Sequence, residues 1–179
     1  MDRYKNAKTK YPFLKLRLCY YCFKENFRNK TAFRQKYFLI RNYILKYFKA
    51  ADVSYDIKGM NELKEQNSIL FVVKATNEYE KLLAYSALCR PVNVILDDYE
   101  FQGFINKNIL KYLNAKRISS NDELNELDNN LNYIKFVDNF DDLDLNTNLN
   151  IVKIDIVNGS LLFDEFNHGN IKINFNVLK

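Results

Sequence analysis

The sequence contains no tryptophan, a single histidine, two prolines and four glycines among its 179 residues. So few prolines and glycines exclude collagen-like and proline-rich architectures. The glycines are too widely scattered to form a GxGxxG or Walker-type loop around a phosphate. No apolar run approaches the roughly 18 residues that a membrane-spanning helix needs. Residues 1–10 are polar and no compact apolar segment follows them, which predicts that a secretory signal is absent.

The three cysteines are odd in number, and without a secretory signal they predict reduced thiols in a cytoplasmic protein. Cys19 and Cys22 form a CxxC pair, a spacing that zinc sites use. Zinc would need two more ligands, and the candidates Cys89 and His168 are far away in the sequence. We interpret the pair as thiols packed at helical spacing and the histidine as part of a turn in NHGN. We therefore predict no metal ligands and no cofactor.

The charge is divided unevenly along a chain whose overall composition, 47% hydrophobic and 27% charged, is typical of a globular protein. Residues 1–50 hold 14 lysines and arginines against only Asp2 and Glu25, a net charge of +12. Residues 51–179 carry a net charge of −7. A protein whose charge is divided in this way typically binds a polyanion or an anionic membrane through its basic part. We therefore divide the chain into a basic segment, 1–50, and an acidic body, 51–179.

Two helices are predicted in the basic segment, over residues 13–27 and 33–48. The segment carries 13 phenylalanines and tyrosines interleaved with its cations, the composition of helices that lie on an anionic bilayer. Two alternatives stay open: core helices with a basic exterior, and binding of single-stranded nucleic acid through stacking aromatics. The apolar stripe of the second helix recurs at steps of three and four residues, at Phe33, Tyr37, Ile40, Ile44 and Phe48.

On the membrane interpretation, the cations of this segment lie against the bilayer. Each lysine or arginine close to such a surface contributes on the order of 1 kcal/mol. The protein is then expected in the cytoplasm, peripheral on the inner face of the cell membrane. The residues expected to face the membrane are Lys15, Arg17, Lys24, Arg28, Arg34, Lys36, Arg41 and Lys46.

The acidic body alternates between strands and helices. Residues 68–73 (SILFVV) form a continuous apolar run, typical of a strand buried on both faces. The alternation predicts an α/β protein with a mostly parallel sheet flanked by helices, and the last two strands are expected to add an antiparallel edge. An acidic helix over 121–131 is expected to turn Leu124, Leu127 and Leu131 inward. Further strands are predicted over 53–57, 92–96, 116–119, 133–137, 150–157 and 171–177, and helices over 78–89 and 101–113.

This order of elements resembles the glycerolipid acyltransferases, the family of the lysophosphatidic acid acyltransferases. Members begin with basic, aromatic, membrane-facing helices. A strand ending in a Gly-Asx/Glu-Leu turn follows, as in VSYDIKGMNEL over residues 53–63. A buried strand then leads into the catalytic motif, as in SILFVVK over residues 68–74. The resemblance implies an acyltransferase-like fold, an anionic membrane surface as partner, and an acyl carrier or lipid-like ligand.

The family's first motif is a histidine and an aspartate separated by four residues, directly after that buried strand. The histidine is the general base for the acceptor hydroxyl, and the carboxylate orients it. Here Ala75 stands at the histidine position and Glu80 at the aspartate position, in KATNEYE. A methyl group accepts no proton. The resemblance therefore implies a protein whose catalysis by the family's mechanism is lost or strongly altered.

The two phosphate-binding motifs of the family are also altered. The second, a glycine-led strand ending in an arginine, falls on residues 114–120, where Lys116 and Arg117 are the nearest cations. The third, a Phe-Pro-Glu-Gly turn, falls on 136–139, where Asp138 stands for the glutamate. If activity remains, the resemblance implies acyl transfer from acyl-CoA or an acyl carrier protein to a lysophospholipid. The residues that would line the site are Glu80, Lys116, Arg117 and Asp138.

Two hypotheses from other classes stay open. In one, the protein is a non-enzymatic α/β module whose basic helices bind nucleic acid or an acidic partner protein. In the other, it is a small glycosyltransferase-like enzyme, in which Asp97 and Asp98 follow a buried strand and hold Mg²⁺ together with Glu100. The carboxylates of 138–144 lack the glycine and the twelfth-position glutamate of an EF-hand, so we interpret them as a solvated loop.

Overall fold

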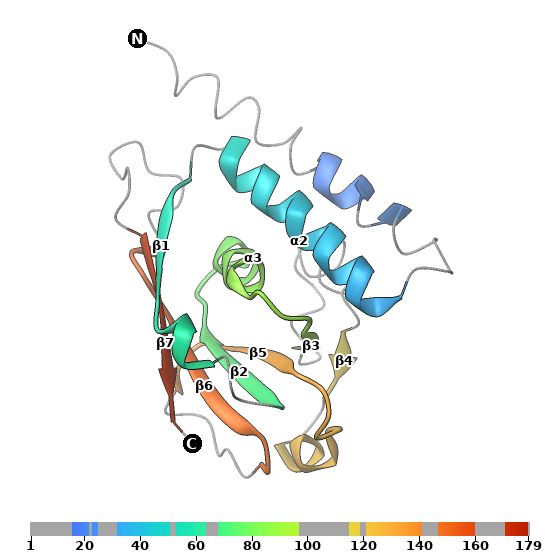
Figure 1. The fold of residues 1–179 in the computed structure, drawn as a ribbon, viewed down its shortest axis with the longest axis vertical. Helices are drawn as coiled ribbons and strands as arrows, with labels where there is room; N and C mark the ends of the chain where they lie inside the picture. Colours follow the sequence, from blue (N-terminus) through green and yellow to red (C-terminus); the bar gives the residue numbers. More distant parts are fainter. Residues whose placement is uncertain are drawn as a thin grey trace.

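A computed structural model describes residues 16–21, 23–24, 32–50, 53–63, 68–96, 115–118, 121–140, 147–159 and 171–178 (Figure 1). Residues 16–21 and 23–24 are helical, and we call them the N-terminal helix segment. The elements that follow are α2 (Phe33–Ala50), β1 (Tyr55–Lys58), η1 (Met60–Leu63), β2 (Ile69–Lys74), α3 (Glu78–Ala87), β3 (Asn93–Leu96), β4 (Lys116–Arg117), η4 (Asn121–Glu126), β5 (Tyr133–Val137), β6 (Asn150–Val157) and β7 (Ile171–Val177). The predicted helix over 101–113 lies outside the described residues.

The described strands form one mostly parallel sheet in the order β1-β7-β6-β2-β5-β3-β4. Every pairing is parallel except that of β6 with β7. The predicted α/β class and the antiparallel pairing of the last two strands are therefore confirmed. The expectation that this pair forms an edge is wrong, because β1 pairs with β7 in parallel, with Tyr55 opposite Ile171, and forms the edge itself.

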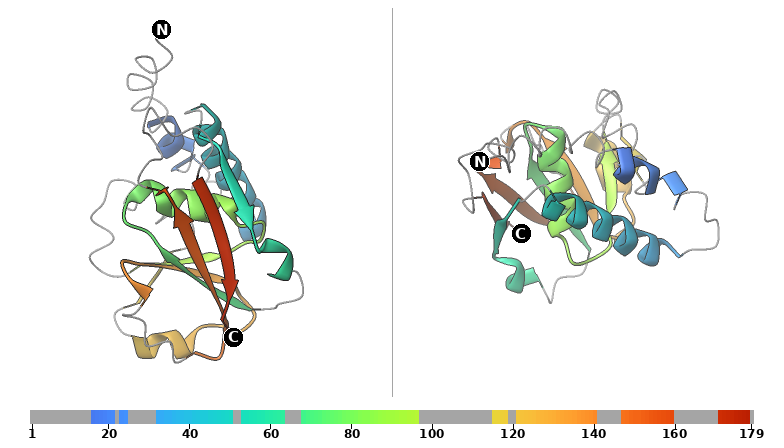
Figure 2. Two further views of the ribbon diagram at one scale, coloured as in Figure 1. Left: turned by 90° about the vertical axis from the view of Figure 1, so that its left-hand side faces the viewer. Right: turned by 90° about the horizontal axis from the view of Figure 1, so that it is seen from above.

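The centre of the sheet is β2, and both of its faces are buried. Phe71 and Val73 point to the face that α2 and α3 cover (Figure 2). Leu70 and Val72 belong to a smaller core on the other face, which Leu124 of η4 and Leu127 just after it help to close. A strand buried on both sides needs apolar residues at successive positions, which is why SILFVV carries no alternation.

The α2 helix packs into the main core. Its buried side chains are Tyr37, Ile40, Ile44, Tyr47 and Phe48, and they belong to the same cluster as the inner residues of α3 and of the sheet. The apolar stripe predicted for this helix is therefore part of the core, and the cations of the helix lie on its outer side. In Figures 1 and 2 the N-terminal helix segment lies against α2, where Leu18 joins the same cluster.

Tyr37 ties α2 to the end of α3. Its single O–H is shared between the carbonyl oxygens of Tyr85 and Leu88, at 3.3 and 3.2 Å from the hydroxyl oxygen. Carbonyls at the end of a helix have no partner within the helix, so the hydroxyl satisfies groups that burial would otherwise leave unpaired. Burial also raises the pKa of Tyr37 well above its usual value of 10.0, since the phenolate would lie in an apolar core.

We expect Tyr37→Phe to lower the free energy of unfolding by about 1–2 kcal/mol, because two buried carbonyls lose their donor. The pH dependence provides a second signature. The unfolded tyrosine ionises near pH 10 and the folded one does not, so the neutral side chain stabilises the protein below pH 10 and that contribution is lost as the pH rises above it. Urea titrations between pH 8 and 11 check this. The decline above pH 10 is expected to be shallower in the variant, and parallel curves would contradict the assignment.

The region predicted as one acidic helix over 121–131 is a shorter 3₁₀ turn, η4. Leu124 and Leu127 are buried as predicted, but Leu131 is 40% exposed, so its inward orientation was predicted wrongly. The reason is local: the Asp128 carboxylate accepts from the backbone N–H and the side-chain amide of Asn130. Such side-chain bonds stabilise a turn at the expense of the helix.

Candidate functional site

The first and third motif positions meet at the carboxyl ends of two paired strands. In the register of β2 and β5, Lys74 lies opposite Val137. The backbone N–H of Ala75 donates to the carbonyl oxygen of Val137 at 3.1 Å. Ala75 and Asp138 therefore follow neighbouring strands side by side. Ligand sites of parallel α/β sheets lie at the carboxyl ends of the strands. Ala75 and Asp138 therefore both lie where a ligand site is expected.

Ala75 is 2% exposed and belongs to the main core, whereas Asp138 is exposed. The neighbouring Phe136, which matches the third motif, is also core: it is 1% exposed, and the Lys81 ammonium lies 5.4 Å from the centre of its ring. The position to which the resemblance assigns the general base thus holds a buried methyl group. Among the described residues there is no histidine to replace it.

Glu80 stands where the resemblance places the orienting carboxylate, and its side chain bonds to Thr76, which directly precedes the N-cap of α3. It is 4% exposed and accepts from the backbone N–H of Thr76 at 2.5 Å and from the Thr76 hydroxyl at 2.9 Å. Gly159 packs directly against it, and a Cβ at that position would overlap the carboxylate. A carboxylate in the first turn of a helix is stabilised by the helix dipole. Glu80 therefore anchors the start of α3.

Asn77 is the cap of this helix. Its side-chain oxygen accepts from the backbone N–H groups of Tyr79 and Glu80, both at 3.0 Å. We expect Asn77→Ala to lower the free energy of unfolding by about 1 kcal/mol. Asn77→Asp, which keeps the acceptor, is the matched control and is expected to stay within about 0.5 kcal/mol of the parent protein. Chemical denaturation checks both, and an equal loss in the two variants would contradict the capping role.

Lys116 and Arg117 lie on β4 at the far edge of the sheet and are exposed. Lys116 pairs with Ile95 of β3, and Ile95 pairs with Lys135 of β5. Three strand spacings separate β4 from β2, which is about 14 Å. Lys116 and Arg117 therefore lie toward the same end of the strands as Ala75, but they are not next to Ala75.

The cations predicted to face a membrane fall into two groups. The side chains of Arg17, Lys24, Arg34 and Lys46 are exposed. Arg41 is half-buried instead, and its guanidinium lies 3.7 Å from the sulfur of Cys89, on the body of the protein. Lys36 is also half-buried. Lys15 and Arg28 lie outside the described residues, as do Cys22, Asp97, Asp98, Glu100 and His168.

The N-terminal helix segment has an exposed apolar face. Leu16, Tyr20 and Phe23 are 59, 60 and 49% exposed. Their spacing of four and three residues places them on one side of a helix. The opposite side faces α2, where Leu18 is buried and the ring of Tyr21 stacks on Tyr43 at 4.4 Å. The same spacing is visible in the sequence, but only packing shows which side is outward.

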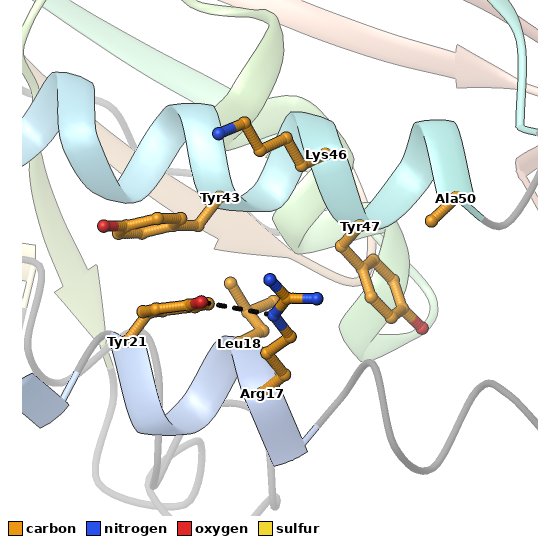
Figure 3. Close-up of a pocket in the computed structure, with 7 residues that line it drawn as sticks. All are labelled: Arg17, Leu18, Tyr21, Tyr43, Lys46, Tyr47 and Ala50. Carbon is orange, nitrogen blue, oxygen red and sulfur yellow. Dashed lines mark hydrogen bonds between the residues drawn. The ribbon is translucent and has the colours of Figure 1, made fainter.

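A pocket of about 160 Å³ lies between the N-terminal helix segment and α2 (Figure 3). Its described lining is Arg17, Leu18, Tyr21, Tyr43, Lys46, Tyr47 and Ala50. The Tyr47 ring is parallel to the ring of Tyr79 on α3, with the centres 6.4 Å apart. Tyr79 lies in the first turn of α3, so Tyr47 packs against the helix that carries Glu80, although no described residue of α3 lines the pocket.

Within the described parts of the chain, no group of three histidine, cysteine or acidic side chains is placed to hold a metal ion. Of the described residues, Cys19 and Cys89 are the cysteines, and neither forms a disulfide. The helices that the structure describes include none with the length and apolar character needed to cross a membrane.

The fold is similar to a known enzyme, although the sequence is not. No protein-family model and no curated protein sequence matches the chain. A crystal structure of the 1-acyl-sn-glycerophosphate (LPA) acyltransferase PlsC from Thermotoga maritima matches it with a TM-score of 0.60 and 13% sequence identity. The match covers 95% of this chain and 85% of that one. The chain therefore has an acyltransferase-like fold, as its order of elements predicted.

Proposed function

We propose that this protein lies on anionic membranes and is an acyltransferase-like protein of phospholipid metabolism that no longer performs base-catalysed acyl transfer. The N-terminal helix segment and the exposed cations of residues 1–50 supply the lipid-contacting surface, and residues 51–179 supply most of the α/β body. The partner is the inner face of the cell membrane. Lys116, Arg117 and Asp138 are proposed as contacts for a lipid-like ligand at the carboxyl edge of the sheet.

The observation that carries the membrane proposal is the exposed face of Leu16, Tyr20 and Phe23. Arg17 and Lys24 are exposed on the same segment. An apolar stripe beside cations suits the boundary between headgroups and acyl chains, where the stripe leaves water and the cations meet lipid phosphates. The net charge of +12 over residues 1–50 adds attraction to an anionic surface.

The loss of catalysis is supported by the two first-motif positions. Ala75 offers no proton acceptor, and Glu80 is bonded to Thr76 rather than available to orient a base. Positioned general bases contribute about 10²–10⁴-fold to a rate. A protein that keeps the fold and the lipid-facing surface without this group is suited to binding rather than to turnover.

Sedimentation with lipid vesicles tests the membrane proposal. We expect the protein to co-sediment with vesicles that contain phosphatidylglycerol, and to remain in the supernatant with pure phosphatidylcholine. Binding is expected to weaken as salt rises, because the electrostatic part is screened, without vanishing at high salt, because the apolar part is not. Binding to single-stranded RNA with no preference for anionic vesicles would contradict the proposal and favour a nucleic-acid module.

A further inference from the structure

The strand β1 forms one edge of the sheet. Among the described strands it pairs only with β7, and Figure 2 shows the two strands side by side at this end of the sheet. Asp56, Ile57 and Lys58 are exposed, and Ile57 is 38% exposed although its side chain is apolar. An edge strand presents backbone N–H and C=O groups to which a further strand can pair. The outer side of β1 is therefore a surface on which an extended segment can dock.

The side chains of β1 alternate between the two faces of the sheet. Tyr55 packs against the main core, so Tyr55 and Ile57 lie on the face that α2 and α3 cover. Asp56 and Lys58 lie together on the opposite face. One face of the strand thus carries an acidic and a basic residue two positions apart. Two charges of opposite sign at this spacing restrict which strand can pair with β1.

A second copy of β1 matches these charges in one antiparallel register. In the register centred on Ile57, that residue faces its counterpart, and Asp56 faces Lys58 of the second copy twice by two-fold symmetry. Opposite charges on facing residues stabilise a strand pair, and like charges destabilise it. Centring the pair on Asp56 or on Lys58 would instead bring two like charges together. Of the registers centred on the three exposed residues, only the one on Ile57 pairs opposite charges.

We infer that the protein self-associates through β1, in an antiparallel pair centred on Ile57 that joins the sheets of two copies. At each end of this pair, Tyr55 of one copy lies opposite Gly59 of the other, which has no side chain and ends the strand at a φ of 80°. A single short strand pair buries little surface, which places the contact among weak interfaces, below about 1,200 Å². We therefore expect the dimer to form as the protein concentration rises from micromolar to millimolar.

Reversing the two charges tests the register. Sedimentation equilibrium of the full chain measures the dissociation constant of the dimer. Asp56→Lys and Lys58→Asp each place like charges opposite one another, and each is expected to weaken self-association by about tenfold, because two cross-strand pairs change sign at once. The double variant Asp56→Lys/Lys58→Asp restores opposite charges and is expected to associate as the parent protein does. An equimolar mixture of the two single variants is expected to form heterodimers for the same reason.

The double variant also controls for effects within one copy. Asp56 lies opposite Lys172 of β7, so Asp56→Lys changes a contact inside the subunit in the single and the double variant alike. Recovery of self-association in the double variant therefore isolates the pairing between copies. Glu126→Lys reverses an exposed charge on η4 and is expected to leave the dissociation constant within about twofold of the parent value. The thermal midpoint of each variant shows that folded proteins are compared.

A disulfide at the two-fold axis provides an independent measurement. Facing residues of antiparallel strands have Cα atoms about 4.5–5.5 Å apart, within the range that a disulfide bridges. Ile57→Cys is therefore expected to form a covalent dimer under mild oxidation. Asp56→Cys is expected to do so much less, because its two copies lie two residues out of register. The parent protein, which has three cysteines, measures the background.

Three results would overturn the inference. One is a parent protein that stays monomeric up to millimolar concentration. Another is a double variant that associates no better than the two single variants, and the third is equal crosslinking of Ile57→Cys and Asp56→Cys. None of these results bears on the membrane proposal, because the N-terminal helix segment takes no part in the strand pair.

Discussion

Replacing Leu16, Tyr20 and Phe23 together with serine is expected to lower partitioning onto anionic vesicles by about a hundredfold. Each of these side chains is about half exposed. Moving that remaining surface from water into the bilayer boundary contributes about 1 kcal/mol apiece. A total of about 3 kcal/mol corresponds to about two orders of magnitude in the partition coefficient. Co-sedimentation over a series of lipid concentrations measures it.

The chain offers a matched control for this experiment. Leu131, Val157 and Leu178 are 40, 42 and 50% exposed and lie outside the N-terminal helix segment. Replacing all three with serine removes a similar apolar surface, and partitioning is expected to change by less than about twofold. If the two triple variants lose binding to the same extent, a general loss of surface hydrophobicity would explain the result, and the membrane face would be misassigned.

The second large effect is expected in an enzymatic assay. Transfer of a labelled acyl chain from acyl-CoA or acyl carrier protein to lysophosphatidic acid is expected to run about 10²–10⁴-fold below the rate of the Thermotoga maritima enzyme assayed in parallel. The cause is the methyl group of Ala75 at the position of the base. Turnover comparable to that enzyme would show that another group accepts the proton. Glu80→Gln shows whether that other group is Glu80. Turnover that depends on the Glu80 carboxylate would contradict its structural role.

The strands and α2 could be predicted because their patterns are local. The apolar run of 68–73 and the stripe of α2 each require a partner surface, and the structure provides one on both sides of β2 and on one side of α2. The order of the strands in the sheet could not be predicted from local patterns. The pairing of β1 with β7 joins residues about 115 positions apart, such as Tyr55 and Ile171. No local pattern encodes it, and for this reason the edge of the sheet was misplaced.

The candidate site was predictable in part for the same reason. The order of elements placed Ala75 and Asp138 after buried strands, and the register of β2 and β5 brings them together. The outward face of the N-terminal helix segment could not be deduced, because aromatic residues occur on two opposite sides of it, Tyr20 and Phe23 on one and Tyr21 on the other. The burial of Leu18 and the stacking of Tyr21 on Tyr43 decide which side is free to meet lipid.

The absence of tryptophan from the sequence allows a direct test of which surface enters the bilayer. Tyr20→Trp and Leu178→Trp each introduce one fluorophore, on the N-terminal helix segment and at the end of the chain's last described strand. With vesicles that contain phosphatidylglycerol, the Tyr20→Trp emission is expected to shift to the blue and to be quenched by brominated acyl chains, while the Leu178→Trp emission stays unchanged. Bound protein in which Tyr20→Trp remains solvent-exposed, or in which Leu178→Trp is the quenched position, would contradict the proposed membrane face.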